Sequence, residues 1–535
     1  MSVIKETASM LTRDRVRLDS DIYRPREEGT FPVLLMRQPY GRAIASTVVY
    51  AHPTWYAKQG YIVVIQDVRG RGTSEGEFNP FIGEVEDGFD TVTWAAQLPR
   101  STGKVGMYGF SYQGMTQLYA AASRPPALKV LCPGMVGYNL YSDWAYENGA
   151  FCLQANLGWA VQLAAETARL KRDRAAYQIL HQASRHLPFD TPSPAFQKAF
   201  QTHCPGSFYQ RWLAHPTFDR DWQSQIPPLD AIDLPQLHIG GWFDPYLRGT
   251  LNLYQQMAKT NSPQSLIIGP WAHLPWGRKV GAIDYGAAAA SPIDSLQIRW
   301  FDCFLKGKEN GILKEPPVRY FEMGSNQWRS FETIAQDNYR TYYLASDGLA
   351  SIQDKSGQLL LTPDPQTQED VLVSDPWRPV PSLGGHPSIP AGSFERSGID
   401  CRTDVLTYTS EPLIEAITVV GQGFILIDCT ADVPSFDLCG ILSEVHPDGR
   451  VYNFTQGYIR VDFPQRPVKI PLQATCTTLK KGTCLRLSLS ATCFPAYAIN
   501  PGTGAFPGET DLIDRQIITI TVERDRASQI QLPLL

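Results

Sequence analysis

The sequence lacks the features that mark several classes of protein. Its ten cysteines are spread thinly and include no C-x-x-C pair, whereas a zinc site needs ligands that lie closer together. No run of 18 or more apolar residues occurs, and residues 1–25 contain no apolar stretch of signal-peptide length. We therefore expect a cytoplasmic protein with buried free thiols, without a membrane partner.

The chain also has no excess of positive charge. Its 48 Lys+Arg against 53 Asp+Glu give a formal net charge of −5, which argues against a nucleic-acid partner and a basic membrane-surface helix. Charged residues make up 19%, below the roughly 25% of an average domain, so long disordered tracts are not expected. The 42 Gly and 41 Pro exceed average usage, which indicates many turns and a β-rich portion.

The first half of the chain has an α/β pattern. Residues 31–36 and 61–65 are continuous apolar runs bounded by turn residues, as in strands buried on both faces of a mainly parallel sheet. Between about residues 140 and 233, apolar residues recur at helical spacing, which predicts a helical insertion. Strand-like runs return at 236–240 and 265–269, so the sheet is predicted to be discontinuous in sequence.

Beyond Pro317 the pattern becomes all-β. Apolar and polar residues alternate over 485–490, and Asp448-Gly449 marks a hairpin turn, which together predict an antiparallel sandwich. The Pro/Gly-rich stretch 375–392 is expected to be a long ordered loop anchored by its apolar side chains, Ile389 among them. The predicted segments are a first α/β part (1–139), a helical cap (140–233), a second α/β part (234–314) and a C-terminal β-sandwich (315–535).

The strongest chemical signal surrounds Ser111. A strand-like run meets Gly-Phe-Ser-Tyr-Gln-Gly (109–114) and then an Ala-rich helical segment. This pattern is typical of the nucleophile elbow of α/β-hydrolases, where a sharp turn strains the serine backbone and excludes bulky neighbours. Gly114 lies three residues after the serine, whereas G-x-S-x-G places the glycine two after. The alternative is an ordinary strand, turn and helix with Ser111 as the cap.

Candidates for the other two members of a catalytic triad follow in the order that α/β-hydrolases use. Asp244 comes directly after the run at 236–240, and His273 directly after the run at 265–269. Both are predicted to project from the carboxyl ends of parallel strands, where open α/β sheets hold their sites. A purely structural histidine is the alternative.

An acyl-transfer site also needs donors for the oxyanion. One donor in such elbows is the backbone N–H after the nucleophile, here that of Tyr112. The second is expected after the first buried strand, where Tyr40 lies in a Pro-Tyr-Gly turn. A packing role for this tyrosine is the alternative.

These residues together carry a family resemblance. The motifs are RQPYG (Tyr40), QDVRGRGTSEGEF (66–78), GFSYQG (Ser111), GGWFDPY (Asp244) and GPWAH (His273). In this order they resemble the family of cocaine esterase, α-amino acid ester hydrolase and X-Pro dipeptidyl-peptidase, the CocE/NonD-type α/β-hydrolases, whose elbow is G-x-S-Y-x-G. The segments PVRYFEMGSNQW, DPWRPVPSLGG and FPAYAINPGTG resemble the family's C-terminal jelly-roll domain, which is galactose-binding-like.

The resemblance implies a role for each residue. Ser111 would be the nucleophile, His273 the general base and then acid, and Asp244 the group that stabilises the imidazolium. The Tyr112 N–H and the Tyr40 hydroxyl would bind the oxyanion. It implies a serine hydrolase without metal or organic cofactor, acting on a small ester first and on a short peptide or amide second.

The substrate is less well defined. α-Amino acid ester hydrolases bind the substrate ammonium with carboxylates that follow the triad aspartate, and here Asp244 is followed by Pro-Tyr-Leu. Asp143 and Glu147 could supply part of such a site, or could be solvated or capping carboxylates. Four aromatic residues suggest an apolar acyl pocket, with ordinary core packing as the alternative: Trp144, Trp159, Trp242 and Phe243.

The alternative from another functional class is a non-catalytic protein. In it, the β-sandwich would bind a carbohydrate or protein partner, and the hydrolase domain would be an inactive scaffold. The complete set of Ser111, Asp244, His273 and Tyr40 counts against it. A monomer and a homo-oligomer both fit the sequence.

Overall fold

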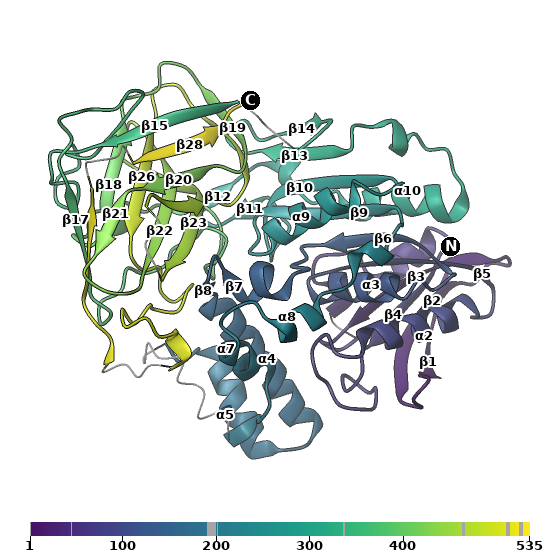
Figure 1. Cartoon of the computed structure of the whole chain (residues 1–535). Helices are drawn as coiled ribbons and strands as arrows, with labels where there is room; N and C mark the ends of the chain where they lie inside the picture. The colour runs from purple at the N-terminus through teal and green to yellow at the C-terminus, as the bar shows by residue number, and fades with distance from the viewer. Residues whose placement is uncertain are drawn as a thin grey trace.

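A mainly parallel sheet forms the first part of the structure (Figure 1). The computed structural model describes residues 2–43, 45–189, 200, 202–334, 338–462, 466–509, 514–523 and 528–535. Within these residues the sheet has ten strands, in the order β1 (Val3–Leu11), β2 (Arg17–Pro25), β4 (Ile62–Asp67), β3 (Phe31–Gln38), β5 (Ser101–Phe110), β6 (Leu128–Gly134), β9 (Gln236–Phe243), β10 (Gln264–Ala272), β13 (Val318–Glu322) and β14 (Gln327–Phe331). The pairs from β4 to β13 are parallel, and those at both edges are antiparallel.

Helices cover both faces of this sheet because its central strands are apolar on both sides. Val33 and Leu35 of β3 pack with α2 (Glu84–Ala96) and α3 (Tyr112–Ala122). Leu34 and Met36 point the other way and pack with α1 (Pro53–Lys58) and α10 (Ile293–Lys306). This alternation follows from the two-residue period of a strand. The predicted continuous apolar runs are thus the buried centre of an α/β sheet.

The helical insertion predicted from the sequence lies between β6 and β9. It comprises a short helical segment (Leu140–Ala145), the hairpin β7 (Tyr146–Glu147) and β8 (Ala150–Phe151), and the helices α4 (Leu153–Leu170), α5 (Arg174–Arg185), α7 (Phe208–Ala214) and α8 (Arg220–Gln225). Part of the predicted segment, residues 190–199 and 201, lies outside the described residues. Figure 1 shows these helices as a separate lobe beside the sheet. We refer to the insertion as the cap.

The described residues from 338 onward are mainly β, as expected, with a short helix α11 (Ser397–Asp400) between strands. In the part of the chain that the structure describes, the larger sheet has nine strands: β23 (Val451–Val461), β22 (Phe436–Val445), β26 (Cys484–Ser490), β18 (Leu406–Ser410), β16 (Gln358–Leu360), β15 (Tyr339–Ala345), β28 (Gln529–Pro533), β20 (Phe424–Ile427) and β24 (Val468–Pro471). Smaller sheets join β17 (Asp370–Ser374), β27 (Ile518–Val522) and β21 (Cys429–Ala431), and β19 (Ile417–Gly421) with β25 (Thr475–Leu479). A separate apolar core lies within this domain.

The two sheet systems meet along the edge that carries β13. Strands β13 and β14 pair with the first sheet, so this sheet extends past residue 314, where the sequence places the end of the second α/β part. The Met323 N–H donates to the Cys476 carbonyl at 2.9 Å, and the Thr478 N–H donates to the Met323 carbonyl at 2.8 Å. The Gln473 amide reaches the Asp244 carbonyl at 2.8 Å, so the all-β domain contacts the loop that carries this aspartate. No helix among the described residues is long and apolar enough to cross a membrane.

Candidate active site

Ser111 lies in the sharp turn that joins β5 to α3. Its backbone angles are φ 59° and ψ −128°, a strained conformation for a residue with a side chain. A Cβ at Gly109 would lie 2.5 Å from the Cβ of Gln113, and a Cβ at Gly114 would lie 2.3 Å from the Val136 Cγ1. Both glycines are therefore required by close packing, Gly109 against Gln113 and Gly114 against Val136.

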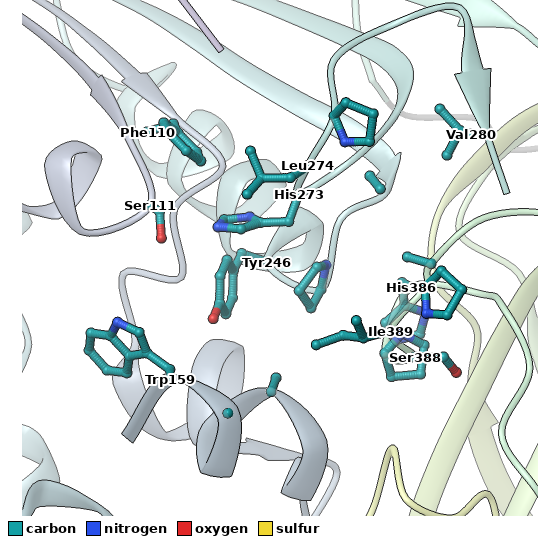
Figure 2. Close-up of a pocket in the computed structure, with 18 of the residues that line it drawn as sticks. Phe110, Ser111, Trp159, Tyr246, His273, Leu274, Val280, His386, Ser388 and Ile389 are labelled. Carbon is teal, nitrogen blue, oxygen red and sulfur yellow. The ribbon is translucent and has the colours of Figure 1, made fainter. Parts of the chain in front are cut away.

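Asp244 and His273 meet at the carboxyl ends of two neighbouring strands. Asp244 follows β9, is fully buried, and accepts a hydrogen bond of 2.8 Å from His273 Nδ1 through Oδ1. His273 follows β10, and its imidazole lies between the rings of Phe110 and Tyr246, 5.3 Å and 5.0 Å away. Because Nδ1 is bound to the acid, Nε2 is the free nitrogen, and Figure 2 shows the imidazole turned toward Ser111.

Tyr40 lines the same cavity as Ser111. It follows β3, and its hydroxyl accepts a bond of 3.1 Å from the Trp159 indole N–H. Burial raises the pKa of Tyr40 to about 12, so the phenol stays protonated at neutral pH. A hydroxyl that accepts from an indole keeps its own proton for an acceptor in the site.

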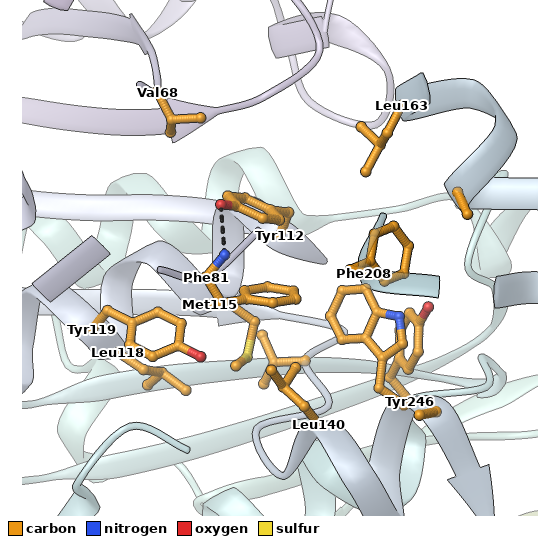
Figure 3. Close-up of a cluster of buried hydrophobic side chains, with 14 of the residues drawn as sticks. Val68, Phe81, Tyr112, Met115, Leu118, Tyr119, Leu140, Leu163, Phe208 and Tyr246 are labelled. Carbon is orange, nitrogen blue, oxygen red and sulfur yellow. Dashed lines mark hydrogen bonds between the residues drawn. The ribbon is translucent and has the colours of Figure 1, made fainter. Parts of the chain in front are cut away.

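Tyr112 contributes its backbone to the site and its side chain to the core. Its ring stacks on Phe81, with the ring centres 4.8 Å apart. The hydroxyl donates to Glu84 at 2.7 Å. It also accepts from the Phe81 N–H at 3.2 Å, the bond drawn in Figure 3. The Tyr112 N–H is the first of α3, so no earlier carbonyl of the helix pairs with it.

A cavity of about 820 Å³ opens in front of Ser111 and His273 (Figure 2). All three parts of the chain line it. The α/β part contributes Phe110 and Tyr246, and the cap contributes Trp144 and Trp159. The C-terminal domain adds residues 386–391 and Phe394, and the walls are mostly apolar.

The structure separates the four aromatic residues predicted to line an acyl pocket. Trp144 and Trp159 line the cavity, but Trp242 and Phe243 do not, and the prediction for these two is wrong. Both are buried in the core cluster that joins the first sheet to the all-β domain, where the Trp242 indole donates to the Phe321 carbonyl at 2.7 Å. Their strand, β9, is covered on both faces, so neither side chain is directed to the site.

Asp143 and Glu147 do not line this cavity either. They are buried rather than solvated. Asp143 accepts from the Asn139 N–H at 3.0 Å and closes its own loop. Glu147 accepts from Arg248, His386 and Tyr497 at 2.8, 2.9 and 2.6 Å, and these bonds join the cap to both other parts. Their combined effect lowers the pKa of Glu147 to about 2, against the opposing effect of burial.

Several cavity residues were not predicted from the sequence. Tyr246 follows two residues after Asp244, and its position next to the triad candidate was the only signal for it. Ile389 was expected to anchor its loop, but it is 63% exposed and lines the cavity. The Gln154 side chain of α4 instead fixes this loop, with bonds of 2.9 and 3.2 Å to the Ile389 N–H and carbonyl.

The sheet, the cap and the serine turn define an α/β-hydrolase. Residues 14–275 match the model of the X-Pro dipeptidyl-peptidase (S15) family, and residues 310–531 match that of the X-Pro dipeptidyl-peptidase C-terminal non-catalytic domain. The chain is 29% identical to cocaine esterase of Rhodococcus sp. (strain MB1 Bresler) over 558 residues, covering 98% of this chain and 97% of that protein.

Two solved structures share the whole fold. An aminopeptidase from a marine sediment archaeon, Thaumarchaeota archaeon, superposes with a TM-score of 0.82 at 23% identity, covering 100% of this chain and 96% of that one. An α-amino acid ester hydrolase does so with a TM-score of 0.81 at 22% identity, covering 100% and 97%. The chain belongs to the family of serine hydrolases that includes cocaine esterase and the S15 X-Pro dipeptidyl-peptidases. Its activity is that of a serine-type esterase or peptidase.

Proposed function

We propose that the protein hydrolyses carboxylic esters through an acyl-enzyme on Ser111. The observation that carries this proposal is the 2.8 Å bond between His273 Nδ1 and Asp244, with the imidazole facing Ser111 across one cavity. The Rhodococcus relative is named cocaine esterase, which supports an ester as the substrate.

Each step uses a group of the site. Ser111 Oγ attacks the ester carbonyl while its proton passes to His273 Nε2, and Asp244 stabilises the resulting imidazolium. The imidazolium then gives this proton to the departing alcohol, which leaves the acyl group on Ser111. Water attacks the acyl-enzyme as His273 takes its proton, and the acid is released as Ser111 regains its hydrogen.

The negative charge of each tetrahedral intermediate needs two donors. The Tyr112 N–H and the Tyr40 hydroxyl are the proposed pair. The Trp159 N–H supports this role for Tyr40, because it occupies a lone pair of the phenol oxygen and so directs the phenol proton elsewhere. The pKa of about 12 keeps that proton in place during the reaction.

The cavity favours an apolar acyl group without a free amino group. Aromatic and aliphatic side chains make up most of its walls, and no Asp or Glu is among the described residues that line it. A substrate ammonium would therefore lose its hydration without gaining a carboxylate partner. Esters of apolar acids are expected before α-amino acid esters and dipeptides.

Replacement of the nucleophile tests the mechanism. Ser111→Ala should lower kcat for a p-nitrophenyl acyl ester by about 10⁴ to 10⁶ and leave the fold intact by circular dichroism. Ser388→Ala is the matched control, because Ser388 lines the same cavity and takes no part in the proposed chemistry. Near wild-type activity of Ser111→Ala would remove the assignment.

X-Pro dipeptidyl-peptidase activity is the second candidate, because the S15 family model bears that name. The assay compares kcat/KM for a p-nitrophenyl acyl ester, an α-amino acid ester and an X-Pro-p-nitroanilide. The ester without an amino group should be the best substrate. Faster turnover of the anilide would make the protein a peptidase first. The cytoplasmic location stays a prediction from the sequence.

A further inference from the structure

Arg71 is a buried cation without an acidic partner. It lies four residues after β4, is 1% exposed, and forms no ion pair with any described residue. Its Nη1 and Nη2 both donate to the Leu163 carbonyl at 3.3 Å, and its guanidinium lies over the Phe78 ring, 3.8 Å from the ring centre. Its Nε has no hydrogen-bond partner among the described residues. Burial of an unpaired charge lowers stability, so its presence calls for a functional reason.

The carbonyl that Arg71 binds belongs to the cap helix α4, one turn after Trp159. Trp159 donates to the Tyr40 hydroxyl at 3.1 Å, and Tyr40 lines the same cavity as Ser111. Arg71 therefore holds the helical turn that positions the indole on the proposed oxyanion donor.

The charge of Arg71 also reaches Tyr40. It acts to lower the pKa of that phenol, against the larger opposite effect of burial. Glu166 is the acid that most favours the charged form of Arg71, but its carboxylate is bound by Arg169 at 2.7 Å. A positive charge in a water-poor interior stabilises nearby negative charge more than it would in water.

We propose that Arg71 is a positioning residue of the oxyanion hole that acts through Tyr40: it fixes α4 so that Trp159 orients the Tyr40 hydroxyl, and its unpaired charge makes that hydroxyl a stronger donor to the tetrahedral anion. The inference rests on the proposed function, because it needs an anion to form at Tyr40. The neutral ester gains nothing from this charge, so Arg71 contributes to kcat and not to substrate binding.

The first test separates these two effects. Arg71→Met removes the charge and keeps much of the bulk, and it should lower kcat about tenfold with KM changed less than about threefold. Arg71→Lys, which keeps the charge, should recover part of the loss. An alkylboronic acid bonds through boron to Ser111 Oγ, whose proton passes to His273, and forms a tetrahedral anion. Its affinity should fall in parallel with kcat.

The decisive test is a double-mutant cycle with Tyr40→Phe. In the Tyr40→Phe background, Arg71→Met should cost less than about twofold in kcat. An equal cost in both backgrounds would overturn the inference, because Arg71 would then act independently of Tyr40. Arg71→Gln, which can still donate to the Leu163 carbonyl, repeats the cycle if the methionine variant does not fold.

The same set of variants distinguishes a failure of the proposed function from a failure of the inference about Arg71. If Ser111→Ala keeps its activity, the mechanism itself is wrong. If Ser111→Ala is inactive but Tyr40→Phe loses nothing, the oxyanion assignment is wrong, and the inference about Arg71 falls with it. If both variants lose activity and the Arg71 cycle is additive, only the inference about Arg71 is wrong.

Discussion

Tyr40→Phe isolates the contribution of one hydroxyl group to the reaction. The substitution keeps the ring, which packs against the core around Ser111, and removes the oxygen that accepts from Trp159. If the phenol binds the developing oxyanion, the loss should appear in the chemical step and not in substrate binding.

The expected loss in kcat follows from the number of hydrogen-bond donors in the oxyanion hole. The proposed hole has two, the Tyr112 N–H and the Tyr40 hydroxyl, so the variant keeps one. Removal of one oxyanion donor costs about 10² to 10³ in kcat, or about 2.7 to 4 kcal/mol. The variant also removes the acceptor of the partly buried Trp159 N–H, which should lower the free energy of unfolding by about 0.5 to 1.5 kcal/mol, the value of one hydrogen bond.

The assay is steady-state hydrolysis of a p-nitrophenyl acyl ester, with thermal unfolding measured on the same samples. Tyr108→Phe is the matched control, since Tyr108 is also buried but its hydroxyl has no hydrogen-bond partner among the described residues. It should keep wild-type kcat. A loss of less than tenfold for Tyr40→Phe would refute the reasoning and make Tyr40 a packing residue.

Three other variants test the remaining parts of the account. The pKa of Glu147 is lowered from 4.5 to about 2, so its carboxylate stabilises the fold fully above pH 4.5 and progressively less as the pH falls toward 2. Glu147→Gln should remove about 3 kcal/mol of this pH-dependent stability, measured by acid titration followed by circular dichroism. Gly114→Ala should lower the free energy of unfolding by about 1 to 3 kcal/mol and reduce kcat, because the new Cβ would meet Val136. In the control Gly398→Ala the new Cβ meets nothing within 4 Å, so stability and kcat should both stay unchanged. Trp242→Phe should lower thermal stability and leave KM unchanged across a series of acyl chain lengths; a shift in chain-length preference would return Trp242 to the acyl pocket.

The order of the triad candidates could be predicted because each is tied to a strand. Ser111, Asp244 and His273 all follow strand-like apolar runs, and the carboxyl ends of parallel strands share one edge of a sheet. In the structure Asp244 is bonded to His273, and His273 and Ser111 line one cavity. Local pattern and sheet geometry predicted the place of these residues at one edge of the sheet, whereas their roles were implied by the order of triads in α/β-hydrolases and by the family resemblance.

The wall of the cavity could not be predicted in the same way. Trp159 lines it and Trp242 does not, although both are aromatic residues on or near predicted site elements. The difference depends on which face of each element the other parts of the chain cover. Ile389 reaches the cavity from a different domain, through its loop's contact with Gln154, and no local pattern encodes that contact.

Covalent labelling tests the central claim most directly. The protein is treated with a fluorophosphonate, which bonds to an activated serine, and the modified peptide is identified by mass spectrometry. We expect a single modification on Ser111, absent in the Ser111→Ala variant and strongly slowed by replacement of His273 with alanine. Modification of another serine, or unchanged labelling of the Ser111→Ala variant, would contradict the account.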